Sequence, residues 1–253
     1  MQTKIDYWLW KSIISKTDCQ KIINRGLEQL ELNDSKGIDN KAITWGDRQK
    51  SKDRTISTKD LTLEEIKEKN INTNDVYVRD SNIAWLSDQW IYDLIWDWVK
   101  KANIRAGWNY EFDYSEPCQF TIYNKDQFYG WHSDGPNDNH SVKVRKIPGV
   151  LDENNEDKHL LIDIPELVGK VRKLSITLML SDPKDYEGGN LKFDFGVHKE
   201  TKRFEEISGG QVNQGSMVVF PSYKYHCVTP VTKGTRYSLV AWFNGRPMKW
   251  FMM

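Results

Sequence analysis

A histidine and an aspartate stand two residues apart in YGWHSDGP, residues 129–136. In an extended segment successive side chains point to opposite faces, so His132 and Asp134 are expected to point the same way. An imidazole and a carboxylate side by side supply two of the three ligands of the two-histidine, one-carboxylate site that binds Fe(II) in non-haem oxygenases. The same triplet also occurs in ordinary turns, so its meaning depends on a second histidine.

Four other histidines are available as that ligand. His140 and His159 lie in a polar stretch, residues 137–171, and His198 follows the turn-like residues FGV. His226 stands at the entrance of a predicted strand, directly after a Pro-Ser turn. Because a ligand needs a fixed backbone, the local sequence favours His226, though by a modest margin.

An arginine follows His226 at a distance of ten residues. A 2-oxo acid that chelates iron leaves its distal carboxylate free, and a planar guanidinium binds such a group with two parallel hydrogen bonds. A hairpin over residues 225–243 would place His226 and Arg236 on neighbouring strands. Ser238 shares the face of Arg236 and offers a hydroxyl, and Tyr123, on the strand before the H-x-D triplet, offers a phenol.

Four blocks of the sequence carry a resemblance to a known family. The sequence resembles the Fe(II)/2-oxoglutarate-dependent dioxygenases of the prolyl 4-hydroxylase superfamily, and within it the bacterial and phage PKHD-type hydroxylases. The blocks agree in order, spacing and turn residues: IAWLSD (83–88), QFTIYNKDQFYGWHSD (119–134), LSITLMLSDPKDYEGGNLKF (174–193) and GSMVVFPSYKYHCVTPVTKGTRYSLVAW (215–242).

The resemblance implies a double-stranded β-helix, or jelly roll, with a catalytic metal near one open end. It implies that His132, Asp134 and His226 bind Fe(II). It also implies that Arg236 binds the distal carboxylate of 2-oxoglutarate, that Tyr123 hydrogen-bonds the same carboxylate and, more weakly, that Ser238 assists. The expected cofactor is Fe(II), the expected co-substrates are 2-oxoglutarate and O2, and ascorbate is a candidate reductant.

The activity that the resemblance implies is hydroxylation of an unactivated C–H, with release of succinate and CO2. A prolyl or other residue of a peptide or protein is the favoured substrate. The same chemistry on a small molecule, a free amino acid or a nucleic-acid base is an alternative, and so is a non-catalytic jelly-roll binding module. Nucleic-acid dealkylases resemble a pattern with a second arginine six residues after the first, where this chain has Trp242.

Two departures from the family pattern concern loops. Asp126 stands where relatives usually have glycine between the tyrosine and the first histidine, which affects a turn and leaves the ligands in place. The stretch 137–171 is longer than expected, and long excursions of this kind are binding loops, lids or disordered segments. Arg79, in VRDSNIAWL, is a further candidate for substrate contact, although a surface or structural charge is the commoner role. The sequence alone does not decide whether Arg79, Ser238 or Trp242 touches co-substrate or substrate.

The elements that must position these residues follow from periodicity. Residues 15–32 and 88–103 have apolar side chains at helical spacing, and Thr17 with Gln20 makes a capping-box pattern for the first helix. A short strand at 42–45 and a short helix at 62–69 are also predicted. Short β-rich runs then alternate with turn residues, at 118–123, 173–180, 190–195, 216–221, 225–231 and 236–243. This order predicts an α+β fold, mainly β: an antiparallel sandwich or jelly roll with helices against one sheet.

The bulk composition limits the class of protein. We expect one domain over residues 1–253, with a helix-rich support at 1–112 and a jelly-roll core at 113–246 into which 137–171 is inserted. Lys+Arg and Asp+Glu are both 36, so net charge gives no case for a nucleic-acid partner. Three scattered cysteines without a C-x-x-C pair favour a reducing compartment, and neither a signal peptide nor a membrane span is expected. Together these features predict a cytoplasmic protein, and oligomeric state is not readable.

Overall fold

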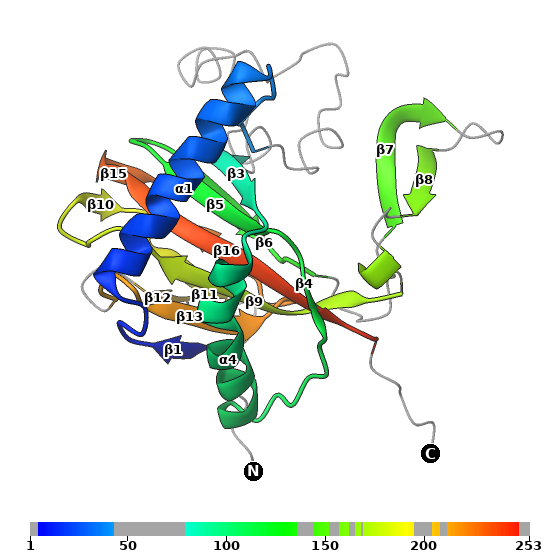
Figure 1. Cartoon of the computed structure of the whole chain (residues 1–253). Coiled ribbons are helices and arrows are strands. Elements are labelled where there is room, and N and C mark those ends of the chain that lie inside the picture. The colour runs from blue at the N-terminus through cyan, green and yellow to red at the C-terminus, as the bar shows by residue number, and fades with distance from the viewer. Residues whose placement is uncertain are drawn as a thin grey trace.

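The computed structural model describes residues 5–42, 79–135, 144–151, 157–161, 165–167, 169–194, 204–207 and 212–247. The predicted strand at 42–45, except Ala42, and the predicted helix at 62–69 lie outside these residues. Within them the chain is mainly β, with two long helices, and all strand pairs are antiparallel (Figure 1). The predicted mainly-β fold with helical support is therefore confirmed.

The larger sheet has the strand order β1-β13-β9-β16-β5-β3 among the described residues, and β4 pairs with β16 outside this path. It draws β1 and β3 from the N-terminal half, which therefore contributes strands as well as helices. Its strands are β1 (Trp8–Trp10), β3 (Asn82–Leu86), β4 (Tyr114–Ser115), β5 (Cys118–Tyr123), β9 (Val171–Met179), β13 (Met217–Pro221) and β16 (Arg236–Gly245).

The smaller sheet has the order β12-β11-β14-β6-β2 among the described residues. Two further strands, β10 and β15, pair only with each other among the described strands. In the sequence each of them connects a strand of one sheet to a strand of the other. The bounds are β2 (Arg79–Asp80), β6 (Phe128–His132), β11 (Leu191–Asp194), β12 (Phe204–Ile207), β14 (His226–Val228), β10 (Tyr186–Gly188) and β15 (Val231–Gly234). Two facing antiparallel sheets of this kind form a jelly roll.

The helices α1 (Lys16–Ser35) and α4 (Gln89–Arg105) cover one face of the larger sheet (Figure 1). Both helices were predicted, and the apolar stripe of α4 packs on the sheet as expected. The predicted capping box is wrong in position: Ser15, not Thr17, caps α1, because its hydroxyl oxygen accepts a hydrogen bond from the backbone N–H of Asp18 at 3.0 Å. Arg25 on α1 donates to Asp88, the residue before α4, at 3.0 Å and ties the helices together.

Strand alternation divides each central strand into a helix-facing and a pocket-facing set. On β5, Cys118, Phe120 and Ile122 join the core under the helices, so Gln119 and Tyr123 face the smaller sheet. On β16 the pattern is the same over eight residues: the core takes every second side chain from Tyr237 to Phe243, and the pocket takes Arg236, Ser238, Val240 and Trp242. Period-two alternation in these strands thus aims polar side chains between the sheets.

The polar stretch 137–171 is more regular than a plain loop. Its described part forms a hairpin, β7 (Val144–Leu151) with β8 (Asp157–Leu161), followed by the 3-10 helix η2 (Pro165–Leu167). Among the described strands, β7 and β8 pair only with each other. The hairpin is inserted between β6 and β9, directly after the H-x-D triplet.

Asp126, at the position where a glycine was expected, lies in the turn between β5 and β6. Its φ is 70°, in the left-handed region that Asp tolerates better than most residues. Its backbone N–H donates to Val231 O at 2.7 Å, so the turn is tied to β15. The substitution is therefore accommodated in the turn itself, and the strands on either side keep their pairing.

Candidate metal centre

Two histidines face each other across neighbouring strands. His132 is the last residue of β6 and His226 is the first residue of β14, and the two are directly opposite in register. Their ring centroids are 4.2 Å apart. Residues 94 positions apart in sequence (226 − 132) therefore meet because β6 and β14 pair in the smaller sheet.

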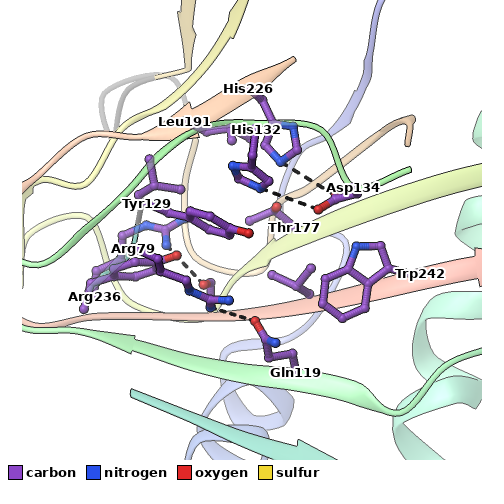
Figure 2. A pocket seen from close by; sticks show the side chains of 14 residues that line it. Arg79, Gln119, Tyr129, His132, Asp134, Thr177, Leu191, His226, Arg236 and Trp242 are labelled. Carbon is purple, nitrogen blue, oxygen red and sulfur yellow. Dashed lines mark hydrogen bonds and ion pairs between the residues drawn. The ribbon is translucent and has the colours of Figure 1, made fainter. Parts of the chain in front are cut away.

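Asp134 lies two residues beyond the end of β6, in a segment fastened to the larger sheet. The backbone N–H groups of Asp134 and Gly135 both donate to Ser222 O at 2.9 Å, just after β13. From β9, Arg172 Nη1 donates to the backbone carbonyl of Asp134 at 3.1 Å. The carboxylate then lies 3.5 Å from His132 Nε2 and 3.7 Å from His226 Nε2, and all three groups offer ligand atoms within 4.8 Å of one another (Figure 2).

Both imidazoles are oriented by the backbone. His132 Nδ1 lies 2.8 Å from Gly130 O, and His226 Nδ1 lies 2.8 Å from Lys224 O. A carbonyl oxygen only accepts, so Nδ1 of each ring carries the proton and donates it. In the neutral rings Nε2 is then unprotonated, and both Nε2 lone pairs point toward the Asp134 carboxylate. Metal-bound histidines are oriented in this way.

Burial and neighbouring charges set the protonation of the site. Burial lowers the pKa of His226 to about 4, and the attraction of Asp134 only partly opposes this. Burial alone would raise the pKa of Asp134, but the nearby His226 and His132 outweigh it, and the pKa falls well below its usual range. At neutral pH His226 is therefore a neutral imidazole and Asp134 a carboxylate, the forms that bind metal.

The site fits a divalent transition metal on the chemistry of its atoms. Asp134 Oδ2 is buried without a hydrogen-bond partner among the described residues, and the two unprotonated nitrogens face the carboxylate, His132 Nε2 nearest Oδ1 and His226 Nε2 nearest Oδ2. Lone pairs that face one another repel, and a buried acceptor without a partner is costly. A cation between them satisfies all three atoms, and two imidazoles with one carboxylate suit Fe(II). Of the other histidines, His140 and His198 lie outside the described residues, and only the backbone of His159, on β8, is described.

Arg236 lies in the larger sheet, directly opposite Tyr123 on β5. The expectation that a hairpin makes its strand a neighbour of the His226 strand is wrong: β14 belongs to the smaller sheet and β16 to the larger one. The chain passes through β15, which pairs with β10, and so crosses from one sheet to the facing one. Arg236 and His226 consequently approach the pocket from opposite walls.

The Arg236 guanidinium is 1% exposed and has few protein partners. Nη1 donates to Ser238 Oγ at 3.1 Å, Nη2 lies 3.4 Å from Met179 Sδ, and Nε is buried without a partner. Its carbon Cζ is 5.4 Å from the centroid of the Tyr123 ring. A buried guanidinium with an unused N–H, and with no carboxylate partner among the described residues, has the chemistry to bind an anion.

A pocket between the two sheets contains the triad and Arg236 (Figure 2). Reasoning from the sequence identified its charged and aromatic members but missed Gln119 and Thr177. Their signal was present: each is a polar residue at a pocket-facing position of a strand whose other face is apolar. The lining residues are Arg79, Gln119, Tyr123, Tyr129, His132, Asp134, Thr177, Leu191, His226, Val228, Arg236, Ser238, Val240 and Trp242.

A second ion pair supports the Asp134 segment from outside the pocket. Arg172 donates to Glu116 through Nε at 2.8 Å and Nη2 at 2.6 Å, while its Nη1 holds the Asp134 carbonyl. Asn244 Nδ2 also donates to Glu116, at 3.1 Å, and the guanidinium lies 4.1 Å from the centre of the Trp242 ring. This bidentate pair fixes the guanidinium plane and hence the carbonyl that it binds.

A jelly roll with two histidines and an aspartate in one pocket has the ligand set of non-haem Fe(II) oxygenases. Comparison with known proteins identifies the family. The sequence model of the 2OG-Fe(II) oxygenase superfamily matches residues 118–244, half of the chain. The chain therefore belongs to this superfamily, and the resemblance seen in the sequence is confirmed. Membership implies Fe(II), 2-oxoglutarate and O2 as cofactor and co-substrates.

Curated relatives are PKHD-type hydroxylases. The chain is similar to one from Synechococcus sp. (strain CC9605), 44% identical over 104 residues, or 40% of this chain and 44% of that protein. It is also similar to one from Escherichia coli (strain K12 / DH10B), 32% identical over 127 residues, or 49% of this chain and 41% of that protein. The chain thus spans less than half the length of these relatives.

Solved structures agree in fold. A viral collagen prolyl hydroxylase from Paramecium Bursaria Chlorella virus-1, determined with 2OG, superposes with a TM-score of 0.53 at 15% identity, over 95% of this chain and 97% of that one. A Pseudomonas putida prolyl-4-hydroxylase gives 0.52 at 16% identity, over 95% and 93%. At these identities the likeness establishes the fold.

Neither described helix is long and apolar enough to span a membrane.

Proposed function

We propose that this protein is an Fe(II)- and 2-oxoglutarate-dependent hydroxylase that acts on a C–H bond of a prolyl or other residue in a peptide or protein and releases succinate and CO2. The observation that carries the proposal is the convergence of two Nε2 lone pairs on the buried Asp134 carboxylate, one oxygen of which has no hydrogen-bond partner among the described residues. Family membership supports the same chemistry. The peptide substrate rests on relatives named as prolyl hydroxylases, one of them determined with a hypoxia inducible factor peptide fragment.

Six residues of the pocket have a defined part in this proposal. His132, Asp134 and His226 hold the metal, which with 2-oxoglutarate and O2 supplies the oxidising power for C–H hydroxylation. Arg236 binds the distal carboxylate of 2-oxoglutarate, and Ser238, whose oxygen already accepts from Arg236, is free to donate its own proton to the same carboxylate. Tyr123 donates its phenol proton to the same carboxylate in this proposal, which its position opposite Arg236 and in the pocket lining supports.

The chain also holds the co-substrate away from bulk water. The pocket lies between the two sheets, and its lining includes Thr177 and Val240 from the larger sheet and Leu191 from the smaller one. Arg236 is 1% exposed and Ser238 is 1% exposed, so the anion that they bind is desolvated. Charge-assisted bonds are stronger in such surroundings, which favours a doubly charged co-substrate over a neutral analogue.

Succinate formation tests the proposal directly. The purified protein, loaded with Fe(II) and 2-oxoglutarate in air, should release succinate, because such enzymes turn over slowly even without their substrate. Asp134→Ala should reduce the rate to background since one of three ligands is lost. Asp93→Ala, an exposed position on α4, is the matched control and should leave the rate unchanged.

The outcomes separate the proposal from its alternatives. A non-catalytic binding module releases no succinate under any condition, and that result would refute the proposal. For the substrate, incubation with host-cell proteins and proline-containing peptides should give a mass gain of one oxygen atom on a peptide residue. If only free amino acids or other small molecules gain the oxygen, the chemistry stands and the peptide substrate is wrong.

A further inference from the structure

Arg79 is a buried arginine in the same pocket that the proposed chemistry does not use. It lies on β2, at the edge of the smaller sheet, directly opposite Tyr129 on β6, and is 9% exposed. Its side chain reaches across to the larger sheet, where Nη2 donates to Gln119 Oε1 at 2.7 Å (Figure 2). Its Nε donates to Ser81 Oγ, two residues further along the chain, at 2.7 Å.

The guanidinium also lies close to the proposed metal ligands. Its carbon Cζ is 4.5 Å from the centroid of the Tyr129 ring, and that ring stacks on the His132 imidazole with centroids 3.5 Å apart and planes at 10°. Arg79, Tyr129 and His132 thus form one stack along the wall of the pocket. A ligand bound to Arg79 is therefore separated from the proposed metal ligand His132 by one ring, that of Tyr129.

Among the described residues, none neutralises the charge of Arg79. Both of its hydrogen-bond acceptors are neutral, no carboxylate of the described chain pairs with it, and neither of these hydrogen bonds uses Nη1. The neighbouring carboxylate of Asp80 points to the other face of the strand and accepts from Gln127 at 2.8 Å. Tyr129 offers a ring face but no formal charge, because burial raises the pKa of its phenol.

The other two arginines near the triad differ in whether a protein carboxylate pairs with them. Arg172 has a bidentate carboxylate, Glu116, and its role is structural. Arg236 has none among the described residues, and the proposed function gives it the distal carboxylate of 2-oxoglutarate. Arg79 resembles Arg236 in this respect. A buried cation without a counter-ion is costly, so a site that keeps one implies an anion that arrives with a ligand.

A count of charges shows that 2-oxoglutarate is not that anion. The doubly negative co-substrate offsets the doubly positive metal, and Asp134 offsets Arg236, with both histidines neutral as ligands. One positive charge is left, and it is that of Arg79. With metal and 2-oxoglutarate bound, one further negative charge would therefore make the pocket neutral. That charge belongs on the side of the triad where Arg79 and Tyr129 lie.

We propose that Arg79 binds a carboxylate of the substrate, so that the hydroxylated molecule carries a negative charge near the carbon that reacts. This rests on the proposed function, since it concerns the substrate of that same site. Two sources of the carboxylate are compatible with the pocket: the terminal carboxylate of a small acid or of a chain end, and the side chain of an acidic residue. Arg79 is in either case a specificity-determining residue.

The test uses the folded protein with Zn(II), which does not turn over, in place of Fe(II), and with 2-oxoglutarate. Binding of acetate, and of acetamide as its neutral match, is followed by ligand-observed NMR. We expect acetate to bind at least about tenfold more tightly than acetamide, and Arg79→Gln to abolish this preference. Arg79→Lys keeps the charge and should retain most of it. Arg105→Gln, an exposed arginine on α4, is the matched control and should bind acetate like the unaltered protein.

Two further pairs distinguish the sources of the carboxylate. N-acetylproline against its methylamide reports on a terminal carboxylate, and N-acetylaspartate methylamide against the asparagine compound reports on a side chain. The proposal is overturned if acetate binds no better than acetamide, or if Arg79→Gln binds acetate normally. It is also overturned if Arg79→Gln loses affinity for 2-oxoglutarate instead, which would assign Arg79 to the co-substrate. Failure of Zn(II) and 2-oxoglutarate to bind at all would instead refute the proposed function.

Discussion

Arg236 combines deep burial with an incomplete set of partners. It is among the largest fully buried side chains, yet within the described part of the chain its Nε has no hydrogen-bond partner and its Nη groups bond only to a hydroxyl and a thioether. Folding has thus desolvated a cation without pairing it. Such a group binds an incoming carboxylate strongly, because no protein carboxylate has to be displaced first.

Replacing Arg236 should therefore weaken 2-oxoglutarate more than it slows the reaction. Hydrogen bonds to charged groups contribute about 1.5–3 kcal/mol, so Arg236→Ala should raise the KM for 2-oxoglutarate about 10- to 100-fold. Arg236→Lys should raise it less, since it keeps the charge and loses the planar fork. Succinate formation against 2-oxoglutarate concentration measures both. An unchanged KM in Arg236→Ala would remove the residue from this role.

Residue types and spacing were enough to single out the triad and Arg236, but not their surroundings. The H-x-D triplet, a histidine at a strand entrance and an arginine ten residues later are local patterns. Glu116 and Arg172 could not be singled out in this way, because they are 56 residues apart and become partners only when β9 and the segment before β5 lie side by side. The sequence identified Arg79 as a candidate for substrate contact but could not assign it a ligand. That assignment depends on the lack of a carboxylate partner among the described residues, which only the structure shows.

At the scale of elements, α1 packs on the larger sheet without room for a single added methyl group. A Cβ at Gly26 would lie 2.3 Å from the Phe120 ring, which is fully buried and cannot move aside. Gly26→Ala should lower the free energy of unfolding by about 1–3 kcal/mol, despite the better helix propensity of alanine. Urea denaturation measures this. Glu28→Ala, exposed on the same helix, should change stability little, and equal stability of Gly26→Ala would contradict the close contact.

The Glu116–Arg172 pair predicts a long-range effect on the metal. Glu116→Gln removes the charge that fixes the Arg172 guanidinium, and with it the orientation of the Asp134 carbonyl. Loss of an interaction that supports a metal ligand typically costs 10–100-fold in affinity, and we expect at least about tenfold weaker metal binding by calorimetry. Glu28→Gln is the control. Normal affinity in a folded Glu116→Gln variant would show that Ser222 alone is enough to hold the segment.

Strands were predictable and their partners were not. The runs at 118–123 and 236–243 are strands at almost the expected residues, because alternation is a property of the local sequence. The expected pairing of the His226 and Arg236 strands failed because the short strand between them, β15, pairs with β10 and carries the chain to the other sheet. The sheet to which a strand belongs depends on which distant strand it pairs with, and the local sequence pattern does not predict that pairing.

The whole molecule determines how the site is assembled. The smaller sheet supplies both histidines, and the larger sheet supplies Arg236 and Tyr123 and holds Asp134 through Ser222 and Arg172. In the proposed function, metal and 2-oxoglutarate therefore bridge the two sheets, which also meet through these polar contacts and through apolar ones, such as that of Phe193 with Phe220, whose ring centroids are 5.0 Å apart. Ligands that bridge two parts of a fold bind the folded state and not the unfolded chain.

Linkage then fixes what ligand removal must do to stability. At a concentration 100 times its Kd, a ligand stabilises the fold by about 2.7 kcal/mol, which is about 5–10 °C in Tm for a chain of this size. Zn(II) should raise the Tm, and 2-oxoglutarate should raise it further only when metal is present, because it chelates the metal. EDTA should reverse both shifts. The Asp134→Ala variant should show neither the increase in Tm caused by Zn(II) nor that caused by 2-oxoglutarate. The Arg236→Ala variant should keep the increase caused by Zn(II) and lose most of the increase caused by 2-oxoglutarate. If 2-oxoglutarate raised the Tm equally with and without metal, it would not be bound at the triad, and the two walls of the pocket would serve separate ligands.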